Sequence, residues 1–161
     1  MDAEAAYDKV IRLLAQRSHS RAELVRKLRR RGVSKAVASE AVDRAAEQGY
    51  VNDAEFALLF AEQAQGRGLA PARIRRELAT RGVEAQHVEA ALKAAFGEVD
   101  LGARALELAR QRLPRLSGEA ESVRRRLAAF LKRRGFPTHV IIDALDAVAP
   151  PGEPPYIGRA Q

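Results

Sequence analysis

The sequence contains no cysteine, few aromatic residues and no long apolar run, and each absence excludes a class of protein. Without cysteine the chain has no disulfide, no thiolate metal site and no cysteine nucleophile. Aromatic residues form only 5% of the chain, so alanine, leucine, valine and isoleucine must fill the core, and this palette favours helices over strands. No apolar stretch has the length of a membrane span, and the acidic first residues do not resemble a signal peptide. We therefore expect a cytoplasmic protein that does not bind membranes.

The motifs of common catalytic and metal sites are also missing. The three histidines, His19, His87 and His139, lack metal-ligand spacing and are expected at surface or boundary positions, with His19 in a linker. The Gly-Arg-Gly fragment at 66–68 lacks the ending of a phosphate-binding loop. No nucleophile, base and orienting group can be assembled from the remaining residues. The sequence therefore predicts a binding protein with no enzymatic activity, no cofactor and no metal.

The chain carries a formal net charge of +7. This excess favours polyanions or acidic protein surfaces as partners and makes binding sensitive to salt. An alternative interpretation is that the many arginines reflect a genome rich in G and C, so that an individual arginine has no functional meaning.

A pattern of apolar residues closed by a glycine recurs three times, with a period of about fifty residues. The aligned positions are Leu24, Leu28, Gly32 and Val33, then Ile74, Leu78, Gly82 and Val83, then Leu127, Leu131, Gly135 and Phe136. The match continues through Ala41, Val42 and Ala45, through Ala91, Leu92 and Ala95, and through Ala144, Leu145 and Val148. Spacings of three and four residues indicate amphipathic helices, and each glycine with its apolar successor is typical of a Schellman helix stop.

Each copy is expected to contain three helices. The first helices are predicted at 4–16, 53–65 and 100–113, and the third helices at 35–48, 85–96 and 138–148. Between them lies a second helix, which begins with a capping box at Ser20 in the first copy and with Pro71 at its first position in the second. Linkers are predicted at 17–19, 66–69 and 114–121, and no strand is predicted.

The expected fold is therefore all-α, with three tandem three-helix repeats that resemble helix-turn-helix units and stack into an elongated, curved array. The repeats are assigned to residues 1–50, 51–98 and 99–149. Residues 150–161 hold four prolines and two glycines and are expected to form a flexible tail. A monomer is expected, because each repeat already supplies a neighbour for the next.

Basic residues recur on the outward face of the second helix in each repeat. An isolated charge run is usually a solvated helix face, but repetition in register favours a positive stripe that binds phosphates or acidic protein. The candidate contact residues are Arg26, Lys27, Arg29, Arg30, Arg73, Arg76, Arg125 and Arg133.

The stretch from Gly49 to Ala57, with the sequence GYVNDAEFA, resembles the GY-x-[DN]-D-x-x-[FY]-A signature of the RecX family. The segments 20–32 and 67–83 resemble the family's flanking S-x-x-E-L-x-x-K-L-x-x-[RK]-G and G-x-x-x-[IL]-x-x-E-L-x-x-[RK]-G-[IV] patterns. The resemblance extends from Ala6 to Val148 and departs at Asn52, in the long linker before the third repeat and in the tail.

The signature residues also have structural roles. Gly49 is expected to end a helix, Tyr50 to pack back over it, Asp53 to cap the next helix, and Phe56 to enter the core. Gly32, Gly82 and Gly135 are likewise interpreted as structural.

The resemblance implies a bacterial regulator of the RecA recombinase that functions in DNA recombination, DNA repair and the SOS response. Such proteins bind RecA filaments on single-stranded DNA and mainly inhibit filament growth, ATP hydrolysis and strand exchange. DNA, single-stranded or duplex, is a second candidate partner. The main alternative is a basic helical protein that binds nucleic acid without a recombinase, and a further one is a helical scaffold for an acidic protein.

Overall fold

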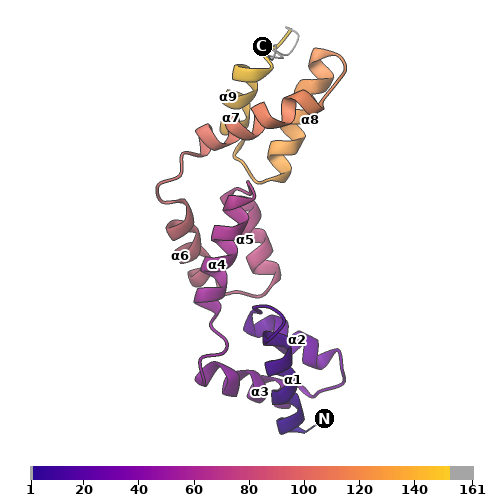
Figure 1. Ribbon diagram of the computed structural model, residues 1–161, viewed down its shortest axis with the longest axis vertical. Coiled ribbons are helices and arrows are strands. Elements are labelled where there is room, and N and C mark those ends of the chain that lie inside the picture. Colours follow the sequence, from indigo (N-terminus) through magenta and orange to yellow (C-terminus); the bar gives the residue numbers. More distant parts are fainter. Residues whose placement is uncertain (1, 153–161) are drawn as a thin grey trace. The chain divides into compact units, whose positions relative to one another are not determined.

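The computed structural model describes residues 2–152, and within them it contains helices and no strand (Figure 1). Repeat 1 comprises α1 (Ala3–Leu14), α2 (Arg21–Arg29) and α3 (Lys35–Glu47). Repeat 2 comprises α4 (Asp53–Gly66), α5 (Pro71–Thr80) and α6 (Ala85–Phe96). Repeat 3 comprises α7 (Leu101–Arg112), the short 3-10 helix η1 (Leu113–Arg115), α8 (Ala120–Arg133) and α9 (Thr138–Val148). The all-α prediction with three helices in each repeat is confirmed, whereas η1 was not predicted.

The described chain falls into two compact units whose boundaries do not follow the repeats. The first unit holds the residues up to Ala61 together with Arg75–Ala94, and the second holds Glu62–Ile74 together with the residues from Ala95 onward. The boundaries cut through α4, α5 and α6, so that repeat 2 contributes to each unit. Most of the tail predicted at 150–161 lies outside the described residues.

The predicted starts of α2 and α5 are confirmed, whereas α4 has a different cap from the predicted one. At α2 the Ser20 side chain accepts a hydrogen bond from the backbone of Glu23, whose side chain accepts one from the backbone of Ser20, so the predicted capping box is confirmed. At α4 the predicted cap is wrong. The Asn52 side chain, not that of Asp53, accepts hydrogen bonds from the backbone of the first turn, with N–O distances of 3.0 and 3.1 Å.

The predicted glycine stops are confirmed in all three repeats. Gly32, Gly82 and Gly135 have φ angles of +81°, +76° and +93°, a region that favours glycine. In each case the next amide donates to a carbonyl five residues earlier, as Val83 N does to Leu78 O at 3.1 Å. Gly49 ends α3 in the same way, because its φ is +79° and Tyr50 N donates to Ala45 O at 2.9 Å.

The aligned apolar positions form the core. In repeat 1 both α1 and α2 pack on α3, and in repeat 3 both α7 and α8 pack on α9. The residues aligned on the second helices are fully buried, namely Leu24, Leu28, Ile74, Leu78, Leu127 and Leu131. Alanines on α4, including Ala57, Ala61 and Ala64, are also fully buried. The small, aliphatic residues predicted to fill the interior therefore do so.

Two of the stop glycines have a second role that Gly32 lacks. A Cβ atom added to Gly82 would lie 2.5 Å from Cβ of Ala22, and one added to Gly135 would lie 2.5 Å from the backbone N of Arg73. A Cβ atom on Gly32 would have no neighbour within 4 Å. Gly82 and Gly135 thus allow the second helix of one repeat to touch the second helix of the repeat before it.

This difference predicts unequal effects of the same substitution. Gly32→Ala should lower the free energy of unfolding by about 1–2 kcal/mol, because alanine is strained at positive φ. Gly135→Ala should add a further cost of about 1–3 kcal/mol from overpacking against the backbone of α5. Urea unfolding followed by circular dichroism measures both, and equal losses at the two glycines would show that the close approach is unimportant.

Candidate functional site

The predicted contact residues lie mainly on the surface. Seven are exposed, and the eighth, Lys27, is half-buried. In the first unit they lie on α2 and at Arg76 of α5, and in the second unit at Arg73 of α5 and on α8. Arg26 lies at the edge of a repeat contact, because its Nη1 atom is 3.8 Å from where a Cβ of Gly82 would be. Their role in binding stays a prediction.

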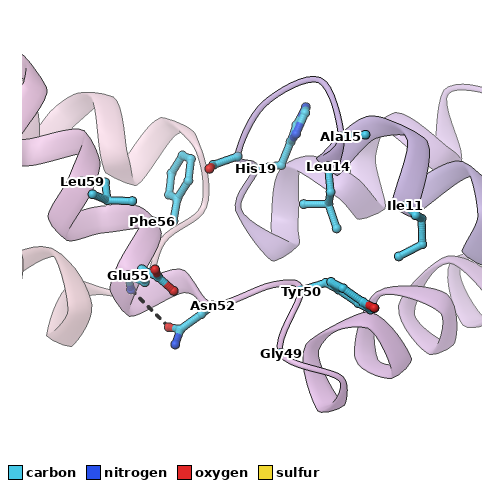
Figure 2. Close-up of a pocket in the computed structure, with 11 residues that line it drawn as sticks. Ile11, Leu14, Ala15, His19, Gly49, Tyr50, Asn52, Glu55, Phe56 and Leu59 are labelled. Atoms are coloured by element: carbon cyan, nitrogen blue, oxygen red, sulfur yellow. Dashed lines mark hydrogen bonds between the residues drawn. The ribbon is translucent and has the colours of Figure 1, made fainter.

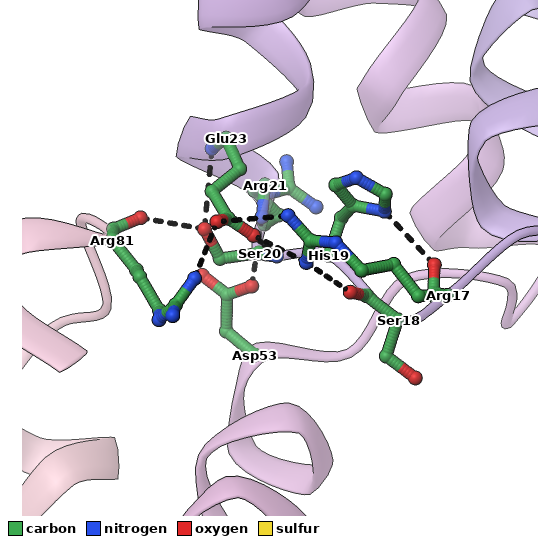
Figure 3. A network of polar contacts seen from close by, with 8 residues as sticks. All are labelled: Arg17, Ser18, His19, Ser20, Arg21, Glu23, Asp53 and Arg81. Atoms are coloured by element: carbon green, nitrogen blue, oxygen red, sulfur yellow. Dashed lines mark hydrogen bonds and ion pairs between the residues drawn. The ribbon is translucent and has the colours of Figure 1, made fainter. Parts of the chain in front are cut away.

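Repeats 1 and 2 meet where the start of α2 touches the turn after α5, and we call this contact the first junction (Figure 3). The Ser20 hydroxyl donates a hydrogen bond of 2.6 Å to the carbonyl of Arg81, which directly precedes Gly82. The same hydroxyl oxygen accepts the capping hydrogen bond of α2. One serine thus caps its own helix and satisfies a carbonyl at the end of another.

A buried carboxylate pairs with two arginines at the first junction. Glu23 is 8% exposed, and its Oε1 atom accepts a hydrogen bond of 2.9 Å from Nη1 of Arg81. The guanidinium of Arg17 reaches both carboxylate oxygens at 3.4 Å. Burial raises the pKa of Glu23, but the hydrogen bonds from Arg17 and Ser20 and the charges of Arg17 and Arg81 outweigh it, so that the pKa lies below its usual value.

Asp53, a residue of the sequence signature, contributes to the same junction. Its Oδ1 atom accepts a hydrogen bond of 2.9 Å from the backbone N of Arg21, the first residue of α2. Asp53 therefore caps the helix of the preceding repeat and not its own, which corrects the prediction. No local pattern predicts this contact, because the two residues are 32 positions apart.

The second junction, between repeats 2 and 3, repeats the backbone contact of the first. Ala70 precedes α5 as Ser20 precedes α2, and its backbone N donates a hydrogen bond of 2.7 Å to the carbonyl of Arg134. Arg134 directly precedes Gly135, as Arg81 precedes Gly82. Both junctions therefore join the start of one second helix to the end of the next.

A shallow cavity of about 450 Å³ opens at the second junction, and we call it the arginine cavity. It is lined by Arg67, Leu69, Arg73, Phe130, Arg133 and Arg134. Nη1 of Arg134 donates to the carbonyl of Arg67 at 2.7 Å, and its guanidinium lies 4.6 Å from the ring centroid of Phe130. Burial, followed by the positive charges of Arg104 and Arg112, lowers the pKa of Arg134. The cavity therefore has an excess of positive charge.

A second hollow, also of about 450 Å³, lies in the first unit between the end of α1 and the start of α4 (Figure 2). It exposes apolar surface, since Tyr50 is 60% and Leu59 43% exposed. The prediction that Tyr50 packs over α3 is therefore wrong, whereas Phe56 enters the core as predicted.

His19 borders this hollow and is buried, which corrects its predicted surface or boundary position. It is only 3% exposed, and its Nδ1 atom lies 2.9 Å from the carbonyl of Arg17. Because a carbonyl only accepts, Nδ1 carries the proton, and Nε2 is buried without a hydrogen-bond partner in the described structure. Burial, together with the charges of Arg17 and Lys27, lowers the pKa of His19.

Residues 2–152 contain neither a cluster suited to a metal ion nor a helix suited to a membrane. Nowhere in this part of the chain do three histidine, aspartate or glutamate side chains come close enough to hold a metal ion. No helix described there combines the length and the apolar character needed to cross a membrane.

Comparison with known families matches all three repeats in order. Residues 6–44, 52–92 and 98–145 match the first, second and third three-helix domains of RecX. The chain belongs to the RecX family. Similar proteins named regulatory protein RecX occur in Chlorobium phaeobacteroides, at 32% identity over 91% of this chain and 95% of the relative, and in Xanthomonas axonopodis pv. citri, at 40% identity over 77% and 75%.

Solved RecX structures share the fold at low sequence identity. RecX from Lactobacillus salivarius matches with a TM-score of 0.73 and 19% identity, over 91% of this chain and 96% of that one. Another crystal structure of a regulatory protein RecX matches with a TM-score of 0.71 and 18% identity, over 89% and 71%. The chain is thus a RecX-family regulatory protein with the RecX fold.

Glu23 should be more important for stability than an exposed partner of an ion pair. Glu23→Gln should lower the free energy of unfolding by about 1–3 kcal/mol, because two guanidinium groups at the first junction lose their carboxylate. The matched control is Glu89→Gln, which breaks the exposed pair with Arg75 and should cost much less stability, because solvent screens that pair. Similar losses in urea unfolding would contradict a structural role for the buried carboxylate.

His19 should make the protein less stable as the pH falls below its ordinary pKa of 6.5. Below pH 6.5 the imidazole is protonated in the unfolded chain but stays neutral in the folded chain, where its pKa is lowered. The stability present above pH 6.5 is therefore lost as the pH falls toward the pKa of the folded state. His19→Asn keeps a donor for the Arg17 carbonyl but cannot titrate, so its unfolding free energy should fall less between pH 7 and pH 5. Parallel pH profiles of wild type and variant would refute this assignment.

Proposed function

We propose that this protein regulates the RecA recombinase, mainly as an inhibitor. It binds RecA filaments on single-stranded DNA as a cytoplasmic monomer and suppresses filament growth, ATP hydrolysis and strand exchange, without catalysing a reaction itself. The observation that supports this proposal most is the match of three successive RecX domains, which leaves little of the described chain for any other activity.

Exposed arginines on the second helices supply the contact in this proposal. Arg26, Arg29 and Arg30 lie on α2, with Arg76 on α5 in the same unit and Arg133 on α8 in the other. Guanidinium groups pair well with carboxylates and with phosphates, so both acidic RecA surface and DNA are suitable targets. The bound protein then occupies space on the filament that a second DNA duplex needs during strand exchange.

A second candidate function is binding of nucleic acid without a recombinase, and the arginine cavity favours it. The two functions differ in how much protein is needed. Titration into a DNA-dependent RecA ATPase assay, with affinity for the bare DNA measured in the same buffer, separates them. Loss of hydrolysis at concentrations too low to coat the DNA supports a filament regulator, and loss only at saturation of the DNA supports simple competition.

Charge reversal on α2 tests the proposed contact. The triple variant R26E/R29E/R30E should lose inhibition of RecA ATP hydrolysis at least about tenfold in effective concentration, because three favourable charge contacts become repulsive. Its circular dichroism should be unchanged, since all three side chains are exposed.

The control is R12E/K35E/K93E, which makes the same change in net charge at exposed positions outside α2. It should inhibit nearly as well as wild type. Full inhibition by the α2 variant would exclude this helix as the contact, and equal loss in both variants would show that only total charge matters.

A further inference from the structure

The repeat alignment reveals a reversal of charge between the two junctions. With Leu24 aligned on Ile74, Arg17 corresponds to Arg67 and Glu23 corresponds to Arg73. The arginine before the stop glycine is present in both, as Arg81 and as Arg134. A set of two arginines and a carboxylate at the first junction is therefore replaced by three arginines at the second.

The first junction shows what an anion does at this place in the fold. The Glu23 carboxylate receives the guanidinium groups of Arg17 and Arg81 and is held by the backbone N of Ser20. At the second junction the corresponding arginines line an open cavity, joined there by Arg133, and no carboxylate is among the lining residues. Arg104 and Arg112 add further positive charge near Arg134.

We propose that the arginine cavity is a binding site for the phosphate groups of a nucleic-acid backbone, which supply from outside the negative charge that Glu23 supplies at the first junction. Phosphate suits the site better than a single carboxylate does. At the first junction one carboxylate binds two arginines, whereas four arginines line this cavity. A phosphate offers more acceptor oxygens, and successive phosphates along a strand offer successive charges.

The way the cavity is built also argues against recognition of bases. Phe130, its aromatic residue, has the guanidinium groups of Arg134 and Arg112 at 4.6 and 5.4 Å from its ring centroid. With its face occupied in this way, Phe130 holds arginines in position and does not offer a platform for base stacking. Binding of nucleic acid at the cavity is therefore independent of the base sequence and sensitive to salt concentration.

This inference deepens the proposed function, because it assigns the cavity to the DNA of the nucleoprotein filament and not to the RecA protein. The phosphate contact itself forms with or without RecA. The test can therefore be done with DNA alone.

The decisive variant transplants the first junction into the second. In repeat 1, Glu23 is followed four residues later by Lys27, and in repeat 2, Arg73 is followed by Glu77. The double variant R73E/E77K copies the arrangement of repeat 1 and leaves the net charge unchanged. It should place a carboxylate between Arg67 and Arg134, occupy the cavity from within and unfold at a temperature no lower than wild type.

Affinity is measured by fluorescence anisotropy with a labelled single-stranded oligonucleotide over a range of salt concentrations. The variant should bind at least about tenfold more weakly at low salt. Its plot of log affinity against log salt should be less steep by about 2, because Arg73 is lost and the new carboxylate occupies Arg67 and Arg134, which removes three arginine contacts to phosphate. The control R75E/E89R reverses an exposed ion pair without changing net charge and should bind as wild type does.

Three outcomes would overturn the inference. One is unchanged affinity and salt slope in R73E/E77K. Another is equal loss in the R75E/E89R control. The third is a swap variant that binds polyglutamate more weakly than wild type does but binds the oligonucleotide equally well. That result would assign the cavity to an acidic protein segment.

A second variant guards against misfolding of the swap. R67Q removes one guanidinium from the cavity but keeps the carbonyl that binds Arg134, and it should weaken DNA binding severalfold. The RecA ATPase assay is run on the same proteins. If wild type binds DNA through the cavity yet does not inhibit RecA, the proposed function fails and this inference stands. If it inhibits RecA but its DNA binding does not depend on the cavity, the proposed function stands and this inference fails.

Discussion

Successive repeats are joined by a contact between two helix ends, each of which has backbone groups that its own helix cannot satisfy. The last carbonyls of a helix lack intrahelical partners, as do the first amides of another. At both junctions the residue that precedes one second helix donates a hydrogen bond to the carbonyl that precedes the stop glycine of the next. The glycine allows this contact for two reasons. It turns the chain at positive φ, and it has no side chain to hold the helices apart.

The donor differs between the junctions, and this affects what else each can do. Ser20 uses its hydroxyl, which leaves its backbone N to bind the Glu23 carboxylate. Ala70 has no polar side chain and uses its backbone N for the same carbonyl contact. Serine at the cap and glutamate three residues later therefore belong together at the first junction, and both are absent from the corresponding places at the second. The second junction has the same backbone contact, with arginine at the position of Glu23.

Local signals predicted the helices well, and long-range contacts escaped them. The stop at Gly82 and the capping box at Ser20 depend on residues within one turn, so sequence alone revealed them. Asp53 and His19 were misplaced because their environment depends on segments distant in sequence. The carboxylate of Asp53 caps a helix 32 positions away, and His19 is buried between a linker and later parts of the first unit. The alignment of the repeats did contain a signal for the arginine cavity, namely arginine at 73 where repeat 1 has glutamate. That signal can be interpreted only once Arg81 is known to contact Glu23, 58 residues away.

The two junctions also differ in what occupies them when no partner is bound. Like charges close together are unfavourable, and the lowered pKa of the half-buried Arg134 reflects burial together with the neighbouring Arg104 and Arg112. An anion that enters the cavity removes part of this repulsion, so its binding stabilises the contact between repeats 2 and 3 as well as the complex. The first junction has less such dependence, because the Glu23 carboxylate already pairs with both of its arginines. Under the proposed assignment, one repeat contact is complete in the free protein, and the other would gain stability from a bound nucleic-acid backbone.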